Sequence, residues 1–200
     1  MVASAFYTFD PIRGVDVAAA IEAITADESD RTRAAALDLL GDEAVTRVEV
    51  HSAALGADAA TLLFVMIVDQ DDGGSALPPL DKDLGRSRLG RFPNADGDPI
   101  RYLMEHSVED EEIGLHSLLG QLRGRLSDSI CATGASGLQL RGWLDEREVG
   151  DLLKAIRSPD WRVSSNEPID GGVGDVCRHL VSHLRAASRR RCGILMRAHD

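Results

Sequence analysis

The last third of the chain, residues 138–200, constrains the fold most, because its hydrophobic pattern changes from a strand period to a helix period and back. Leu138 and Leu140 alternate with polar residues, which predicts a strand. Asp145 follows as the N-cap of a helix, and Glu148 occupies the reciprocal position of a capping box. The apolar face of this helix has the spacing i, i+3, i+4, i+7 and consists of Val149, Leu152, Leu153 and Ile156.

A second helix and a closing strand complete this module. Pro159 is expected to end the first helix, because proline lacks the amide hydrogen that a helix interior needs. Gly193 is expected to break the second helix, so that residues 194–196 form the closing strand. The face of the second helix consists of Val173, Val176, Leu180, Leu184 and Ala187. This pattern predicts an α+β fold, with a mixed sheet and helices packed on it in a single compact domain over residues 1–200.

The N-terminal part of the chain has shorter patterns. Residues 6–9 predict a first strand that ends at Asp10-Pro11. A capping box at Thr25 predicts a helix that ends at Gly41, and alternation over residues 46–50 predicts a strand. An earlier short helix is predicted from the spacing of Val17, Ala20, Ile21 and Ile24.

The middle of the chain is harder to interpret. Residues 62–68 are apolar at every position, which favours a central strand, although periodicity alone also allows a buried helix. Residues 69–99 contain paired glycines and several prolines, and we expect a long irregular connection that is either a binding loop or a lobe boundary. Residues 131–137 are small and predict a turn.

Ser107 is predicted to cap a helix with an acidic first turn, where the helix dipole favours carboxylates. The acidic residues are Glu109, Asp110, Glu111 and Glu112. The buried face of this helix is expected to consist of Leu115, Leu118, Leu119, Leu122 and Leu126.

The charge balance limits the partners of the chain. The formal net charge is −11, from 33 acidic and 22 basic residues. Such a charge disfavours nucleic acid and anionic membranes and favours either solubility or a basic partner. The three cysteines form no CxxC pair, the start resembles no signal peptide, and the longest apolar run is far shorter than the ~20 residues of a membrane span. We therefore expect a cytoplasmic protein.

Two segments of the C-terminal module resemble a known family. They are Gly142-Trp-Leu-Asp-Glu-Arg-Glu-Val, followed by Leu-Leu-Lys-Ala-Ile, and the ending Leu184-Arg-Ala-Ala-Ser-Arg-Arg-Arg-Cys-Gly-Ile-Leu. Both are similar to the uncharacterised bacterial YfbM-like family, and the opening Tyr7-Thr-Phe-Asp fits its pattern loosely. The resemblance implies an α+β fold and no established activity, and it transfers no functional residues.

One motif suggests an enzyme. Asp69 and Asp71 follow the apolar run, as the nucleophile and acid/base follow a strand in Mg²⁺-dependent haloacid-dehalogenase-type phosphohydrolases. The helix, lysine and second acidic pair of that pattern are not recognisable, so a solvated acidic turn is the favoured interpretation.

Two further patterns resemble metal sites. Asn94, Asp96, Asp98 and Glu105 have the oxygen spacing of a calcium loop, but Pro99 stands at the glycine position, which favours an ordinary turn. His179 and His183 are four residues apart on a helix, and boundary histidines are favoured over a zinc pair. No cofactor is expected.

These considerations favour a non-catalytic bacterial interaction protein, of an immunity-like kind, that binds a basic protein partner through an acidic face. The residues proposed for partner binding are Glu109, Glu111 and Glu112. The alternative is a Mg²⁺-dependent phosphohydrolase-like enzyme that uses Asp69 and Asp71.

Overall fold

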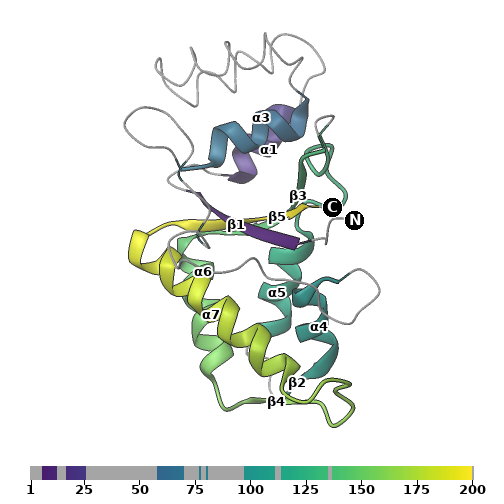
Figure 1. The fold of residues 1–200 in the computed structure, drawn as a ribbon. Coiled ribbons are helices and arrows are strands. Elements are labelled where there is room, and N and C mark those ends of the chain that lie inside the picture. Colours follow the sequence, from purple (N-terminus) through teal and green to yellow (C-terminus); the bar gives the residue numbers. More distant parts are fainter. Residues whose placement is uncertain are drawn as a thin grey trace.

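The computed structural model describes residues 6–12, 17–25, 58–69, 77, 80, 97–110, 114–134 and 137–199. Within them, a three-stranded sheet has helices on both faces (Figure 1). Its strands are, in order across the sheet, β1 (Phe6–Ile12), β5 (Gly193–His199) and β3 (Gln139–Leu144). The predicted α+β fold with helices packed on a sheet is confirmed. The described sheet is not mixed, however, because both of its pairings are antiparallel.

The closing strand, β5, lies at the centre of this sheet and pairs with β1 on one side and β3 on the other. Successive side chains of a strand point to opposite faces. Ile194 and Met196 therefore pack in the larger core, and Leu195 packs in the smaller core on the other face. The sheet thus separates two hydrophobic cores.

Four helices cover the larger core (Figure 1). They are α4 (Pro99–His106), α5 (Leu115–Gly124), α6 (Glu146–Arg157) and α7 (Gly172–Arg190). The predicted capping box of α6 is confirmed, because the Glu148 amide donates to Asp145 Oδ1 at 2.7 Å and the Asp145 amide donates to Glu148 Oε2 at 2.9 Å. Its predicted apolar face is also confirmed, with Val149 and Leu152 fully buried.

The apolar face predicted for α7 is buried, but the helix ends differently from the prediction. Arg191 adopts the left-handed conformation, with φ 53°, and forms the C-cap. Gly193 already belongs to β5, where an added Cβ would lie 2.4 Å from the carbonyl oxygen of Leu144. This glycine is therefore needed for the close approach of two backbones and does not break the helix.

Two helices, α1 (Val17–Thr25) and α3 (Ala59–Ile67), cover the smaller core on the other face (Figure 1). The prediction of α1 is confirmed. The prediction of a strand over residues 62–68 is wrong, because most of that run lies in α3. Asp58 caps this helix by accepting a hydrogen bond from the Thr61 amide at 2.9 Å. Val68 forms only an isolated bridge with Ile12.

Strand β1 continues through Asp10 and Pro11, where the sequence predicted its end. The proline is tolerated because β1 is an edge strand. The carbonyl oxygen of Pro11 accepts a hydrogen bond from the Asp69 amide at 2.8 Å. The helix predicted from Thr25 to Gly41 and the strand predicted over residues 46–50 lie outside the described residues, as does most of 69–96.

The segment around Ser107 differs from its prediction. Ser107 begins the strand β2 (Ser107–Glu109) instead of a helix, and β2 pairs antiparallel with β4 (Trp161–Val163). Helix α5 begins later, at Leu115, after Gly114 in the left-handed conformation. The predicted acidic first turn is therefore wrong, because α5 has no acidic residue in its first turn; Glu109 of β2 instead accepts a hydrogen bond from the Leu115 amide at 2.7 Å. On the predicted leucine face, Leu115, Leu119 and Leu122 are buried in the larger core and Leu118 is partly buried. Leu126 lies after the end of α5 and packs in the smaller core.

Candidate interaction surface

The phosphohydrolase interpretation loses its structural premise. Asp69 follows helix α3 and not a strand. Its amide is bound to Pro11, and its carbonyl oxygen accepts a hydrogen bond from the Leu77 amide at 2.7 Å, so its backbone links the end of α3 to neighbouring segments. Asp71 lies outside the described residues. Asp69 is therefore not presented from the end of a strand, as that class of enzyme requires.

The sequence predicted both histidines of the pair at the boundary of the core, which is correct for His179 but wrong for His183. His183 is buried, and its ring centroid lies 5.0 Å from that of Phe9. His179 is half-buried, one turn earlier on α7. Among the described residues, no group of three or more histidine, cysteine, aspartate or glutamate side chains is arranged to hold a metal ion.

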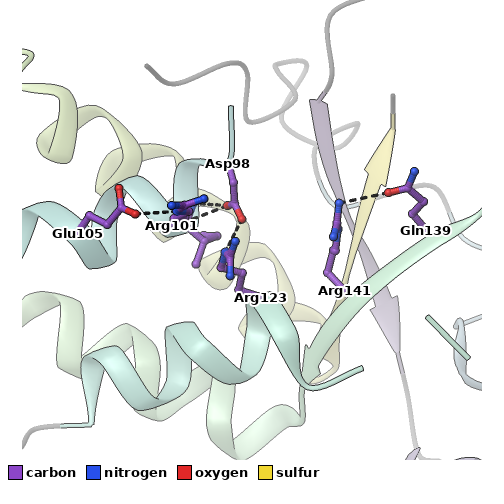
Figure 2. A network of polar contacts seen from close by, with 7 residues as sticks. Asp98, Arg101, Glu105, Arg123, Gln139 and Arg141 are labelled. Atoms are coloured by element: carbon purple, nitrogen blue, oxygen red, sulfur yellow. Dashed lines mark hydrogen bonds and ion pairs between the residues drawn. The ribbon is translucent and has the colours of Figure 1, made fainter. Parts of the chain in front are cut away.

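The carboxylates of the calcium-like pattern stabilise helix α4 (Figure 2). Asp98 Oδ1 accepts hydrogen bonds from the Ile100 amide at 2.9 Å and the Arg101 amide at 3.1 Å. Its other oxygen accepts from Arg123 Nε at 2.6 Å, which ties α4 to α5. Glu105 forms an ion pair with Arg101, with 2.6 Å between Glu105 Oε1 and Arg101 Nε. Both carboxylates thus have structural partners, while Asn94 and Asp96 lie outside the described residues.

Figure 2 also shows a second polar contact, on β3 and apart from Asp98. Arg141 Nη2 donates to Gln139 Oε1 at 3.2 Å. This bond joins two side chains of the same strand, so we assign it no role beyond the local structure of β3.

The cysteines are poor candidates for nucleophiles. Burial raises the pKa of the Cys177 thiol to about 12. Burial also raises the pKa of Cys131. Because the thiolate is the reactive form, both side chains are weakly reactive near neutral pH.

One constellation that the sequence did not reveal resembles a nucleophile, base and orienting acid. Ser107 Oγ lies 2.8 Å from His116 Nε2, and His116 Nδ1 lies 3.7 Å from a Glu109 carboxylate oxygen. However, the buried Ser107 hydroxyl donates to the Leu103 carbonyl oxygen at 2.6 Å, and Glu109 already binds the Leu115 amide. The constellation therefore joins α4, β2 and α5, and its serine is not poised for attack.

The strand pair β2–β4, here called the ribbon (residues 107–109 and 161–163), lies at the end of the molecule away from α1 and α3 (Figure 1). Its inner face contains buried Ser107 and half-buried Trp161, whose indole nitrogen donates to the Ile156 carbonyl oxygen at 3.1 Å. Its outer face contains Val108, with 38% of its surface exposed, beside an ion pair between Arg162 and Asp110. The ribbon is thus held by the larger core but faces solvent.

The chain segments that contain and flank the ribbon are strongly acidic. Residues 105–112 and 157–170 together carry eight acidic and two basic residues. The acidic residues include Asp160 and Asp170 on either side of β4. One of the two arginines, Arg162, is paired with Asp110. Much of the negative charge of the chain is therefore carried by these two segments.

Of the three residues predicted to bind a partner, the structure describes only Glu109. Glu109 lies on β2 in the ribbon, where it also caps α5, and Glu111 and Glu112 lie outside the described residues. The ribbon itself was not predicted. Its signal was the alternation in Trp161-Arg162-Val163, which is too short to be distinguished from a loop.

Comparisons of this chain with protein-family models, curated proteins and solved structures found no match. The resemblance to the YfbM-like family is therefore not tested, and it stays a prediction. In the part of the chain that the structure describes, no helix is both long and apolar enough to cross a membrane.

Proposed function

We propose that this chain is a non-catalytic protein that binds a basic partner protein through the ribbon end of the molecule. The observation that supports this function best is the position of an exposed strand pair within two segments that carry eight acidic and two basic residues. An acidic surface attracts a basic partner over long distances and speeds its association. An immunity-like role in a bacterial cytoplasm is the setting that we expect for it.

Three described side chains of the kinds that perform catalysis have structural roles instead, which supports this proposal. Asp98 caps α4, Glu109 caps α5, and Ser107 binds a helix carbonyl oxygen. No described contact favours the phosphohydrolase alternative, since Asp69 does not follow a strand. A fluorophosphonate probe, which labels nucleophilic serines, tests whether Ser107 is reactive. Covalent labelling of Ser107 would contradict a non-catalytic function.

Charge reversal at matched positions tests the binding surface. Asp170 is exposed in the connection between β4 and α7, whereas Asp128 is exposed in the turn after α5. With an oligolysine peptide as the probe, Asp170→Lys should slow association about three- to tenfold, while Asp128→Lys should change it much less. Stopped-flow fluorescence of labelled peptide measures both rates. Equal effects of the two substitutions would show that the net charge acts without a defined surface.

A further inference from the structure

We propose that the partner binds by adding an extended, basic segment as a third strand along the outer edge of β4. This inference rests on the proposed function, because it assigns a mode of recognition to the same ribbon. In such strand addition, hydrogen bonds of the main chain supply affinity, and alternate side chains supply specificity.

The hydrogen-bond pattern of the ribbon determines which backbone groups are available. The Ser164 amide donates to the His106 carbonyl oxygen at 2.8 Å, and the Asp110 amide donates to the Asp160 carbonyl oxygen at 2.9 Å. In an antiparallel ladder, bonded and non-bonded pairs alternate. The pair Val108–Arg162 therefore exchanges hydrogen bonds within the ribbon.

The same alternation turns the remaining groups of β4 outward. Trp161 and Val163 belong to non-bonded pairs, so their amides and carbonyl oxygens point away from β2. In the described part of the chain, no third strand pairs with β4 and no backbone group bonds to these four groups. Val163 is also 44% exposed. With respect to the described residues, this edge is therefore open to another chain.

The edges of the three-stranded sheet provide a contrast. On β1, the Phe9 carbonyl oxygen accepts a hydrogen bond from the Leu80 amide at 2.7 Å. On β3, the Arg141 carbonyl oxygen accepts from the Leu126 amide at 3.0 Å, and the Leu140 amide donates to the Ala132 carbonyl oxygen at 2.8 Å. Proteins commonly cover edge strands in this way to prevent unwanted pairing. The edge of β4 lacks such cover among the described residues.

Charge complementarity identifies the occupant. A second copy of this chain would bring another net charge of −11 against the first and would place the same acidic segments side by side. A basic segment would instead be attracted by Asp160 and Asp170 on either side of β4. Apolar side chains at its alternate positions would lie beside Trp161 and Val163, since neighbours across strands pack on one face.

Amide hydrogen exchange of the full chain, followed by NMR, tests the proposal. The probe is a blocked peptide of about eight residues that alternates lysine and valine, a typical strand length. Without peptide, the amides of Trp161 and Val163 should exchange fast and that of Arg162 more slowly. With peptide, exchange at 161 and 163 should slow about tenfold or more, whereas exchange at 162 should change little.

Two controls separate strand addition from attraction by charge. A peptide of the same sequence that is N-methylated at every residue keeps its charge but lacks amide donors, and it should bind at least about tenfold more weakly. In the protein, Val163→Pro removes one outward amide and no bond of the ribbon, so it should weaken binding about tenfold, whereas Val163→Thr should not. Slow exchange at Arg162 verifies that the proline variant keeps the ribbon.

Each outcome decides a different point. Equal binding of both peptides, or normal binding by Val163→Pro, overturns strand addition but leaves the acidic surface intact if Asp170→Lys still weakens binding. A peptide that does not bind even at low salt overturns both proposals. Dimerisation of the protein alone that Val163→Pro abolishes would assign the edge to a second copy and overturn the basic occupant.

Discussion

The two faces of the central sheet are covered by helices of different character. On the side of the larger core, α6 has an apolar stripe and an exposed outer face with Glu146, Arg147 and Lys154. On the side of the smaller core, α3 contains no charged residue, and none of its residues is exposed. The sequence predicted α6 with its cap, whereas it favoured a strand where α3 lies. A helix can be predicted from its pattern when its two faces differ, because only then is there a period to detect.

The polar groups beneath the two layers of helices also differ. On the side of the larger core, Asp98, Ser107 and His183 are buried polar residues, and Asp98 pairs with Arg123, whose side chain is 37% exposed. Under α3, by contrast, Asp10 of β1 and Arg197 of β5 form a buried bidentate ion pair, and the guanidinium group lies 4.7 Å from the centroid of the Phe64 ring. The smaller side thus depends on a charge pair as well as on packing.

Removing one partner of that ion pair should give the largest effect. Asp10→Ala leaves the Arg197 guanidinium without its main partner in a site where the arginine side chain is only 17% exposed, so the free energy of unfolding should fall by about 3–5 kcal/mol. The double replacement Asp10→Leu with Arg197→Met should cost much less, because no charge stays buried. Urea titration measures both. A single variant no less stable than the double would show that the pair contributes little.

Matched cavities compare the two cores directly. Leu152 of α6 and Leu63 of α3 are both fully buried, so substitution of either by alanine should cost about 2–5 kcal/mol. If the two cores unfold together, both variants should keep the urea dependence of the wild-type transition. A second transition in the Leu63→Ala variant, or no loss of stability in Leu152→Ala, would contradict the account of one sheet shared by two packed cores.

Helix caps offer a finer comparison. Asp145 caps α6 through the amide of Glu148, and Asp58 caps α3 through the amide of Thr61. Alanine at either position should cost about 1 kcal/mol, because one amide at the helix start loses its partner. Thermal unfolding followed by circular dichroism measures the loss. A negligible effect of Asp58→Ala would mean that packing alone determines where α3 begins.

The smallest expected effect is on the pH dependence of stability in the acid range, through Glu148 of α6. Burial raises the pKa of Glu148, but hydrogen bonds from Arg125 and from the Asp145 amide, with nearby positive charge, lower it overall. Its contribution to stability is therefore complete above the pKa of the unfolded chain and is lost as the pH falls through the lower pKa of the folded state. Glu148→Gln should flatten the pH dependence of the urea midpoint in the acid range. An unchanged acid dependence would contradict this assignment.

The part of the fold that the sequence predicted is the part with long periodic patterns and definite caps. The capping box at Asp145 and the stripe of α7 are examples. The wrong predictions have physical causes. Residues 62–68 are apolar on all sides, so no period distinguished a helix from a strand. Strand β1 continues through Pro11 because it lies at a sheet edge, where the missing amide is harmless, and α7 ends at Arg191 because this residue takes the left-handed conformation that glycine usually occupies.

The candidate surface was harder to predict than the fold. Net charge suggested a basic partner. Glu109 was predicted in the first turn of a helix, whereas it lies on β2 and its carboxylate binds the first amide of α5, six residues further along the chain. The ribbon could not be predicted, because Ser107–Glu109 and Trp161–Val163 are three-residue strands whose pairing depends on the helices beside them. The position of Asp69 was predicted incorrectly for the same reason: it was expected at the end of a strand, but the apolar run before it forms helix α3.

The most direct test of the central claim, that the acidic ribbon end attracts a basic partner, is the salt dependence of binding to the lysine–valine peptide. Stopped-flow measurements should show that moving from low to moderate salt slows association strongly and changes dissociation little, because screening acts on the encounter. The Asp170→Lys variant should reproduce that slowing at low salt. An association rate that ignores both salt and this substitution would contradict the account.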